Sequence, residues 1–326
     1  MAKRVLLGVM GLCLWVTLAQ ALEMGLITGN PLKTYYQLGE NLRDLVARDG
    51  ITLTIYPSAG SVENVLAVYE RPGVQLGLAQ SDVLAYIDAV PDDRHIRRIA
   101  QKVRLVFPLY PEEVHVVASH ASGVVRLPDL EGKTVAIGKP ASGTAQTAQT
   151  LLKLAEVTPA QVLELGDDQA LGALVRGDID AMFDVAGYPN ALLQASLAKD
   201  AKIRLVPITD KAITEFYMAS MIPAGTYSWQ EQEVPTVAVM AALITYDYKG
   251  ENCGYVGRVA KLLYDNLEWL RAHGHPKWQQ VQNLDAPLKP WEQYECVTQA
   301  LRGRTPTNPA PPNPITEALK KMLKAP

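Results

Sequence analysis

Residues 51–82 read ITLTIYPSAGSVENVLAVYERPGVQLGLAQSD, a pattern that alternates between strand and helix. Ile51 to Tyr56 alternates apolar and polar side chains, as a half-buried strand does. Ser61 follows a Pro-Ser-Ala-Gly turn and can cap a helix that runs to about Tyr69. Val74 to Ala79 forms the next strand, and Gln80-Ser81-Asp82 opens a second helix. This order predicts a parallel sheet covered by helices, which is the α/β class.

The same order of elements recurs on both sides of this segment. We expect strands at 22–28, 133–137, 179–184 and 234–245, and helices at 35–48, 144–155, 169–176 and around 256–273. Two of the strand segments, Gly73–Ala79 and Asp178–Asp184, resemble each other, since each follows a helix and a basic residue and ends in a polar loop. The repeat predicts two similar α/β lobes that face one another.

Two extended apolar segments are expected to cross between the lobes. The first is Phe107 to Val117, which Pro108 and Pro111 interrupt, and the second is Phe216 to Ile222. Two crossing strands make a hinge, because a few residues at element ends can absorb domain closure. The expected division is lobe one at 22–115, lobe two at 116–215, and, at 216–326, the return through the hinge, the completion of lobe one and C-terminal helices with a proline-rich tail.

The first 21 residues predict a secretory signal peptide. Lys3 and Arg4 give a positive start, an apolar run follows from Val5 to Ala19, and Ala19-Gln20-Ala21 places small residues at a cleavage site before Leu22. The apolar run is about 15 residues long, which is short of the roughly 20 that span a bilayer as a helix. We therefore expect a periplasmic protein from which residues 1–21 are removed.

Charge and cysteine content narrow the classes of partner. The net charge is −3, and loss of Lys3 and Arg4 makes it more negative, which argues against nucleic acid as a partner because nucleic-acid binders carry a basic face. After cleavage Cys253 and Cys296 remain. In an oxidising compartment such a pair predicts a disulfide, with two buried free thiols as the alternative. A zinc site would need more ligands at closer spacing.

Three polar turns lie where strands lead into helices, at 29–36, 58–64 and 140–144. Ligands of open α/β sheets bind beyond the carboxyl ends of the strands, where helix starts offer free N–H groups and a positive dipole end to an anion. Ser142-Gly143-Thr144 fits such a role, because Gly143 lets a ligand approach the backbone and both hydroxyls can donate. Plain helix capping is the alternative for each turn, but three turns on one edge favour a binding site.

Other side chains near these turns are weaker candidates. We favour Tyr35 over Tyr36 as a ring that faces the ligand, because neighbours on a helix point about 100° apart. Asp184 ends a strand of lobe two and either holds an ammonium group or caps the next helix.

No catalytic constellation is recognisable in the sequence. There is no Gly-x-Ser-x-Gly elbow, no His-Glu-x-x-His motif and no phosphate-binding loop with its lysine. His115 lies in an alternating strand and is expected to be a packed histidine, and His273 and His275 are expected at a solvated helix end. Glu112 and Glu113 are not expected to form an acid/base pair, because neighbours on a strand face opposite sides. We therefore expect no enzyme, no cofactor and no metal.

Several of these turns resemble one family of transport receptors. Thr34-Tyr35-Tyr36-Gln37-Leu38-Gly39 and Gly60-Ser61-Val62-Glu63-Asn64 resemble the Thr-Tyr-Tyr-x-x-Gly and Gly-Ser-Val-Glu-Asn signatures of TAXI-type solute receptors of TRAP transporters. Leu78-Ala79-Gln80-Ser81-Asp82, Ala141-Ser142-Gly143-Thr144, Gly187-Tyr188-Pro189 and Ile222-Pro223-Ala224-Gly225-Thr226-Tyr227 follow in the family's order. The motifs extend from about residue 24 to residue 230.

This resemblance implies a type II periplasmic binding protein fold, in which a small solute is captured between two lobes and delivered to a membrane permease driven by an ion gradient. Glutamate, glutamine and related carboxylates are ligands in the family. The resemblance and the turns together predict these ligand-binding residues: Asn30, Thr34, Tyr35, Ser61, Asn64, Gln80, Ser142, Gly143, Thr144, Asp184 and Tyr188.

The first loop departs from the family's pattern. Where the family has two glycines before Thr-Tyr-Tyr, this chain has Gly29-Asn30-Pro31-Leu32-Lys33, a longer and stiffer loop. Lys33 either supplies a charge for a carboxylate or faces water, and we favour water. Two other classes of function remain open. An exported enzyme would turn over simple esters, phosphates or peptides, and a sensor or adaptor would present its closed form to a membrane signalling partner.

Overall fold

The computed structural model describes residues 22–89, 94–195, 200–288 and 291–302. The predicted signal peptide and the proline-rich tail lie outside the described residues. Among the residues described, no helix is both long and apolar enough to cross a membrane.

Lobe one is built around three parallel strands. Its elements up to the first crossing strand are β1 (Leu22–Ile27), α1 (Thr34–Ala47), β2 (Ile51–Tyr56), α2 (Ser61–Glu70), β3 (Leu76–Gln80), α3 (Ser81–Ala89) and α4 (Arg94–Ala100). β1 pairs in parallel with β2 on one side and β3 on the other. Its C-terminal elements are α9 (Glu251–Asp265), α10 (Leu267–His273), the 3-10 helix η3 (Pro276–Gln280) and α11 (Glu295–Ala300).

Lobe two repeats the arrangement with shorter strands. Its elements are η1 (His120–Ser122), η2 (Leu127–Leu130), β5 (Thr134–Ala136), α5 (Gly143–Leu154), β6 (Gln161–Leu163), α6 (Asp167–Arg176), β7 (Ala181–Ala186), α7 (Ala191–Ala195), β8 (Ile203–Leu205), α8 (Lys211–Thr214) and β9 (Met218–Ile222). β5 pairs in parallel with both β6 and β7. The similar segments that suggested a repeat correspond to β3 and β7, and each lies beside a strand that crosses between the lobes.

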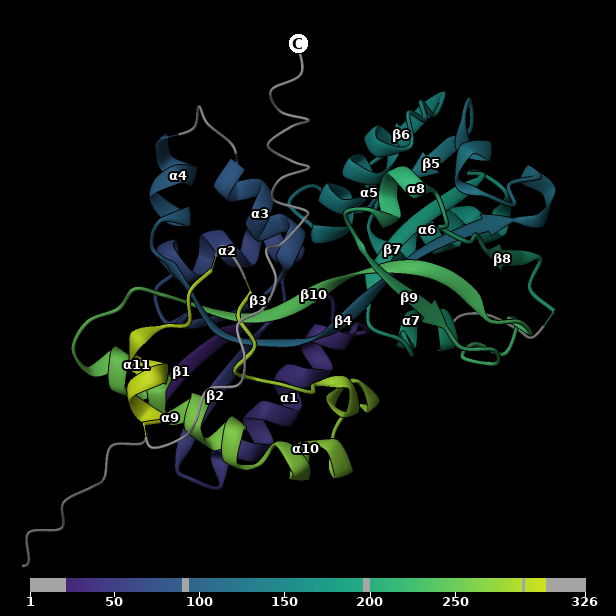
Figure 1. The fold of residues 1–326 in the computed structure, drawn as a ribbon. Helices are drawn as coiled ribbons and strands as arrows, with labels where there is room; N and C mark the ends of the chain where they lie inside the picture. Colours follow the sequence, from purple (N-terminus) through teal and green to yellow (C-terminus); the bar gives the residue numbers. More distant parts are fainter. Residues whose placement is uncertain (1–21, 90–93, 196–199, 289–290, 303–326) are drawn as a thin grey trace, which may run out of the picture.

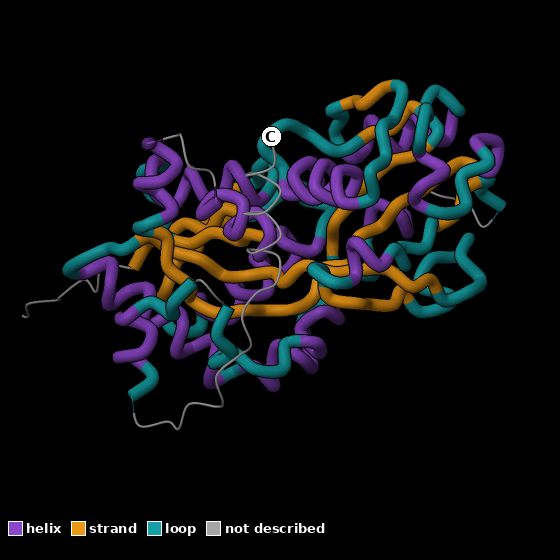
Figure 2. Tube along the Cα trace, turned by 45° about the horizontal axis from the view of Figure 1, so that its top comes forward, coloured by secondary structure: helices purple, strands orange, loops and turns teal. Residues whose placement is uncertain are grey.

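Two long antiparallel strands, β4 (Val103–Ser119) and β10 (Val234–Tyr246), join the lobes. The strand order is β2-β1-β3-β10-β4-β7-β5-β6, so β10 borders lobe one and β4 borders lobe two (Figure 1). Figure 2 shows these strands running from one helix-covered half to the other. The prediction of Phe216–Ile222 as the second crossing segment was wrong, because β9 pairs only with the first half of β10.

The prolines of β4 do not end the strand. The pairing of β4 with β10 shifts register between Met240 and Ala242, opposite Pro111 and Pro108. A proline has no N–H to donate to a neighbouring strand, so a break in the pairing at this point accommodates both residues.

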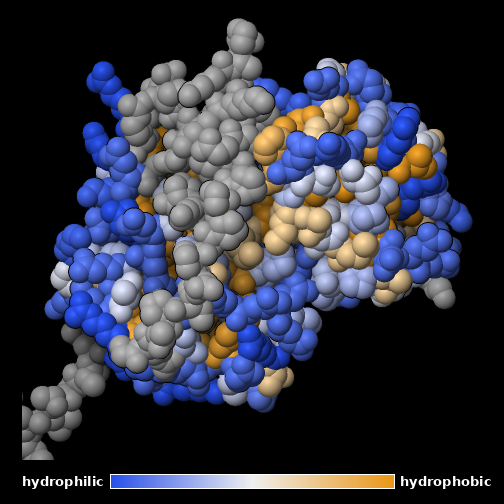
Figure 3. Space-filling view, in the orientation of Figure 1, coloured by the Kyte–Doolittle hydropathy of each residue, from blue (hydrophilic) through white to orange (hydrophobic). Residues whose placement is uncertain are grey.

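Each lobe has apolar side chains on both faces of its strands. In lobe one, α1, α9 and α10 pack on one face, and α2, α3 and α4 on the other (Figure 1). In lobe two, α5 packs on one face and α6 and α7 on the other. Along the edge of lobe one that is visible in Figure 3, the surface is mainly polar.

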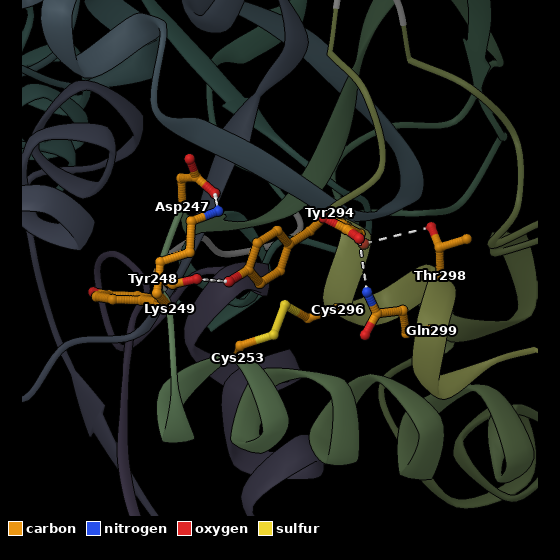
Figure 4. Close-up of a disulfide and its surroundings, with 9 residues drawn as sticks. Asp247, Tyr248, Lys249, Cys253, Tyr294, Cys296, Thr298 and Gln299 are labelled. Atoms are coloured by element: carbon orange, nitrogen blue, oxygen red, sulfur yellow. Dashed lines mark hydrogen bonds and ion pairs between the residues drawn. A yellow bond between two sulfur atoms is a disulfide. The ribbon is translucent and has the colours of Figure 1, made fainter.

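A disulfide joins two C-terminal helices of lobe one. Cys253 at the start of α9 is bonded to Cys296 of α11, with 5.5 Å between their Cα atoms (Figure 4). Beside it the Tyr294 hydroxyl donates to the backbone oxygen of Tyr248. The bond fixes α11 on α9, and α9 in turn packs on α1.

Candidate ligand-binding cleft

A small cavity lies between the lobes, where strands lead into helices. Its lining comes from both lobes: Gly29, Asn30, Lys33, Thr34, Tyr35, Ala59, Gly60, Ser61, Gln80 and Glu112, then Lys139, Ser142, Gly143, Thr144, Asp167, Val185 and Ala186. Its free volume is about 40 Å³. The lobes are in direct contact around it.

The contacts between the lobes define a closed arrangement. The Thr34 hydroxyl donates to the Gly187 carbonyl over 2.8 Å, and the Glu63 amide donates to the Ala141 carbonyl over 3.2 Å. A Cβ atom on Gly143 would stand 1.9 Å from Gln80 Oε1 of the opposite lobe. Glycine at this position therefore lets the two lobes approach.

Four helices begin at the cavity. α1, α2, α5 and α6 all start with residues that line it or directly follow lining residues. Local sequence fixes the starts of α2 and α5, since Gly60 has a positive φ of 134° and the Ser142 hydroxyl accepts from the Ala145 amide. The first N–H groups of a helix lack helical partners and carry a partial positive charge. The cavity is therefore suited to an anionic group.

Lys33 lies inside this cleft, contrary to the prediction that it faces water. Its side chain is only 13% exposed, and its Nζ forms ion pairs with Asp167, at 3.4 Å, and with Asp184. Burial lowers the pKa of Lys33, but the two carboxylates outweigh burial and raise it above the ordinary value. Lys33 is therefore a buried cation that links α1 of lobe one to lobe two.

Glu112 of β4 lines the cavity, although it is not among the ligand-binding residues predicted from the sequence. It is buried, and its Oε2 accepts from the Tyr35 hydroxyl over 2.6 Å. Burial raises the pKa of Glu112 to about 8, so at pH 7 the group is mostly protonated. Glu113 faces the other side of β4, toward Lys277, as expected for neighbours on a strand. The sequence did contain a signal for such a buried carboxyl, since Glu112 and Glu113 lie within an otherwise apolar strand.

The polar side chains of the lining differ in how many hydrogen-bond donors and acceptors they have left for a ligand. Gln80 Oε1 is buried and has no hydrogen-bond partner within the described part of the chain. Thr144 Oγ1 accepts from the Val185 amide, so its hydroxyl keeps a proton to donate. Ser61 Oγ accepts from the Gln80 amide, and its hydroxyl is also hydrogen-bonded to Tyr35. The Ser142 hydroxyl already donates to the Lys139 carbonyl, so the prediction that it can donate to a ligand needs correction.

Three predicted residues lie outside the lining. Asn64 is buried and its amide donates to the Thr28 and Leu78 carbonyls, so it holds the ends of β1 and β3 together. Asp184 forms an ion pair with Lys33 through Oδ1, and its Oδ2 accepts from the Asn190 side-chain amide over 2.5 Å. Lys277 Nζ lies 4.0 Å from the centroid of the Tyr188 ring. The remaining eight predicted residues line the cavity: Asn30, Thr34, Tyr35, Ser61, Gln80, Ser142, Gly143 and Thr144.

The histidines have structural contacts. His115 is buried, its Nε2 is 2.8 Å from the Tyr227 hydroxyl, and burial lowers its pKa to about 3. His275 accepts from the Lys277 amide at the start of η3, and the His273 ring stacks on Trp269. Over the described ranges, no three His, Cys, Asp or Glu side chains form a group that could hold a metal ion.

Comparison with known proteins agrees with this architecture. Residues 26–288 match the family described as the NMT1-like family. A structure titled "Structure of a periplasmic transporter" superposes with a TM-score of 0.55 at 11% identity, covering 94% of this chain and 97% of the other. MatC from Rhodopseudomonas palustris with bound malate superposes with a TM-score of 0.51 at 16% identity, covering 76% and 85%. At these identities the likeness concerns the fold, a mixed α/β type II periplasmic binding protein fold with two lobes.

Proposed function

The chain belongs to the NMT1-like family, and from this premise we propose that it is a solute-binding receptor of the periplasm. Its ligand is a small carboxylate or amino acid, glutamate-like in size and charge, which the two lobes enclose. The TAXI-type motifs further suggest that it delivers the ligand to a TRAP permease driven by an ion gradient. On this proposal residues 1–21 are the export signal, and lobe two, which extends through β9 to Ile222, closes on lobe one.

The convergence of helix starts on one enclosed cavity carries this proposal. The starts of α2 and α5 face each other across the cleft, since a Cβ on Gly60 would stand 3.3 Å from the Gly143 nitrogen. The partial positive charges of two helix starts beside one small space would stabilise a carboxylate there. The Thr144 hydroxyl of lobe two adds a side-chain donor. An anion between the two helix starts therefore holds the lobes together.

The free carbonyl oxygen of Gln80 supports a ligand with a donor group as well. A buried acceptor without a partner costs on the order of 1–3 kcal/mol, and a hydroxyl or protonated group of a ligand would remove that cost. Malate, the ligand of the structure superposed above, is a small hydroxy acid of this general kind.

A thermal-shift screen of the refolded, ligand-stripped protein tests the proposal. Amino acids and small carboxylates are the probes, and a ligand at 100 times its Kd adds about 2.7 kcal/mol of stability. A matched Thr144→Ala variant should bind at least about tenfold more weakly by calorimetry, which corresponds to roughly 1.4 kcal/mol. Unchanged affinity in this variant would place the ligand elsewhere. A well-folded protein that responds to none of the probes would contradict the assignment to small acids.

A further inference from the structure

The cleft already contains a cation of its own. Lys33 Nζ stands between the carboxylates of Asp167 and Asp184, both from lobe two. Asp184 is fully buried and Lys33 nearly so, so this group of charges is largely shielded from water. Lys33 and Asp167 both line the cavity, so the group forms part of its wall.

Both carboxylates are also engaged on their second oxygen. Asp167 Oδ2 accepts from the Asn30 amide over 3.2 Å, and Asp184 Oδ2 accepts from the Asn190 amide over 2.5 Å. A ligand ammonium needs several oxygen acceptors when it is buried, because an unpaired charge away from water is costly. The two carboxylates suited to that role are occupied by the Lys33 ammonium.

The other ionisable groups of the lining cannot take the place of these two carboxylates as partners for a ligand ammonium. Glu112 is the remaining carboxyl, and burial keeps most of it protonated at pH 7 while it accepts from Tyr35. Lys139 is a second cation of the lining. The starts of α1, α2, α5 and α6 add further partial positive charge. The groups that line the cavity are therefore better suited to bind oxygen anions and neutral polar groups than an ammonium group.

We propose that Lys33 is a specificity-determining residue that occupies the place of a ligand ammonium, so that this receptor selects carboxylic acids without an amino group over the corresponding amino acids. This inference rests on the proposed function and narrows its ligand class. The lysine, which directly precedes α1, reaches into lobe two and thus supplies from the protein the ion pair that an amino acid would bring.

Pairs of acids that differ only in the ammonium group give the sharpest test. Calorimetry at pH 7.5 compares glutarate with glutamate and succinate with aspartate. In the wild-type protein the acid without the amino group should bind at least tenfold more tightly in the pair that fits the cavity. In Lys33→Met the two carboxylates lose their cation, so that ratio should fall at least tenfold or reverse. Lys33→Arg keeps the charge and should retain the wild-type order, and Lys139→Met, which removes an exposed cation of the same lining, is the matched control.

The outcomes separate the two proposals. Tighter binding of glutamate or aspartate to the wild-type protein overturns the role of Lys33 and leaves the receptor function standing. An equal change of ratio in Lys33→Met and Lys139→Met also overturns it, because any loss of positive charge would then act alike. Failure of the folded wild-type protein to bind any of the four acids contradicts the proposed function itself, and the inference with it. The wild-type comparison alone remains decisive if Lys33→Met does not fold.

Discussion

Lys277 should be among the most stability-critical charges of the protein. It is 0% exposed, and its Nζ donates to both carboxylate oxygens of Glu113, at 2.8 and 2.6 Å. The same nitrogen donates to the Pro111 carbonyl at 3.0 Å and to Gln280 Oε1 at 2.8 Å. Because Glu113 and Pro111 belong to β4, the lysine attaches η3 to a strand that joins the lobes.

The Lys277→Met variant keeps the volume of the side chain and removes the charge. Among the described residues, Glu113 then retains the Ser220 hydroxyl and the Tyr188 amide as donors, both at 3.3 Å. Removing one partner of a buried ion pair typically costs about 3–5 kcal/mol, because the other charge is left uncompensated. We expect a loss of that size at pH 7.5, and a fall in Tm of about 1.5 °C for each kcal/mol.

The loss should depend on pH with a defined sign. Burial raises the pKa of Glu113, and Lys277 pulls it back toward the ordinary value of 4.5. Without the lysine the folded-state pKa rises further above that of the unfolded chain. A carboxyl of this kind stabilises the fold below its unfolded pKa, and this contribution is lost as the pH rises through the folded pKa. The deficit of Lys277→Met should therefore shrink by up to roughly 1.4 kcal/mol for each pH unit as the pH is lowered toward 4.5.

Urea unfolding of wild type and Lys277→Met at pH 5.0, 6.0 and 7.5 measures both effects. A Lys277→Met/Glu113→Gln double variant is the control, since it removes the charge that was left unpaired and should recover much of the loss. A deficit below about 1 kcal/mol at pH 7.5, or one that is the same at all three pH values, would refute the reasoning.

Three further outcomes are expected. Cys253→Ala/Cys296→Ala should lower the free energy of unfolding by about 4 kcal/mol, because the disulfide closes a loop of 43 residues; urea midpoints that match those of oxidised wild type would contradict this. Burial raises the pKa of Asp82 to about 6, so the stability that its protonated form contributes is lost as the pH rises from about 4 to 6. The urea midpoint of Asp82→Asn should therefore depend less on pH in that window than the midpoint of wild type. The same pH dependence in both proteins would exclude this group. Gly143→Ala should weaken ligand binding at least tenfold with little change in the Tm of the ligand-free protein, because its Cβ would meet Gln80 and Ser61 across the cleft; tight binding by calorimetry would show that the lobes need not approach so closely.

Local patterns predicted the individual elements well, and the pairing of strands less well. The alternation in Ile51–Tyr56 gave β2 with its observed ends, and the apolar spacing after Tyr35 gave α1 to within one residue. The crossing strand was misassigned because Phe216–Ile222 and β10 are both apolar and extended. Which of them reaches lobe one depends on pairing with β3, far away in the sequence.

The same limit explains the errors at the site. Gly143 and Thr144 were recognisable because a helix start with small residues has a local signature. The position of Lys33 was not, because its partners Asp167 and Asp184 come from another lobe. Asn64 belongs to a conspicuous motif, but its amide satisfies two backbone carbonyls, a role that composition cannot distinguish from ligand binding.

The central place of β10 has a consequence for biosynthesis. β10 lies between β3 and β4, yet β4 ends at Ser119 and β10 begins only at Val234. At typical translation rates the ribosome needs roughly 5 to 25 seconds to make the intervening segment. During that interval the N-terminal strands have no neighbour to complete their sheet, so the nascent chain stays open. On the proposed export route, a delay of this kind leaves time for a translocation channel to engage the chain while it is still unfolded.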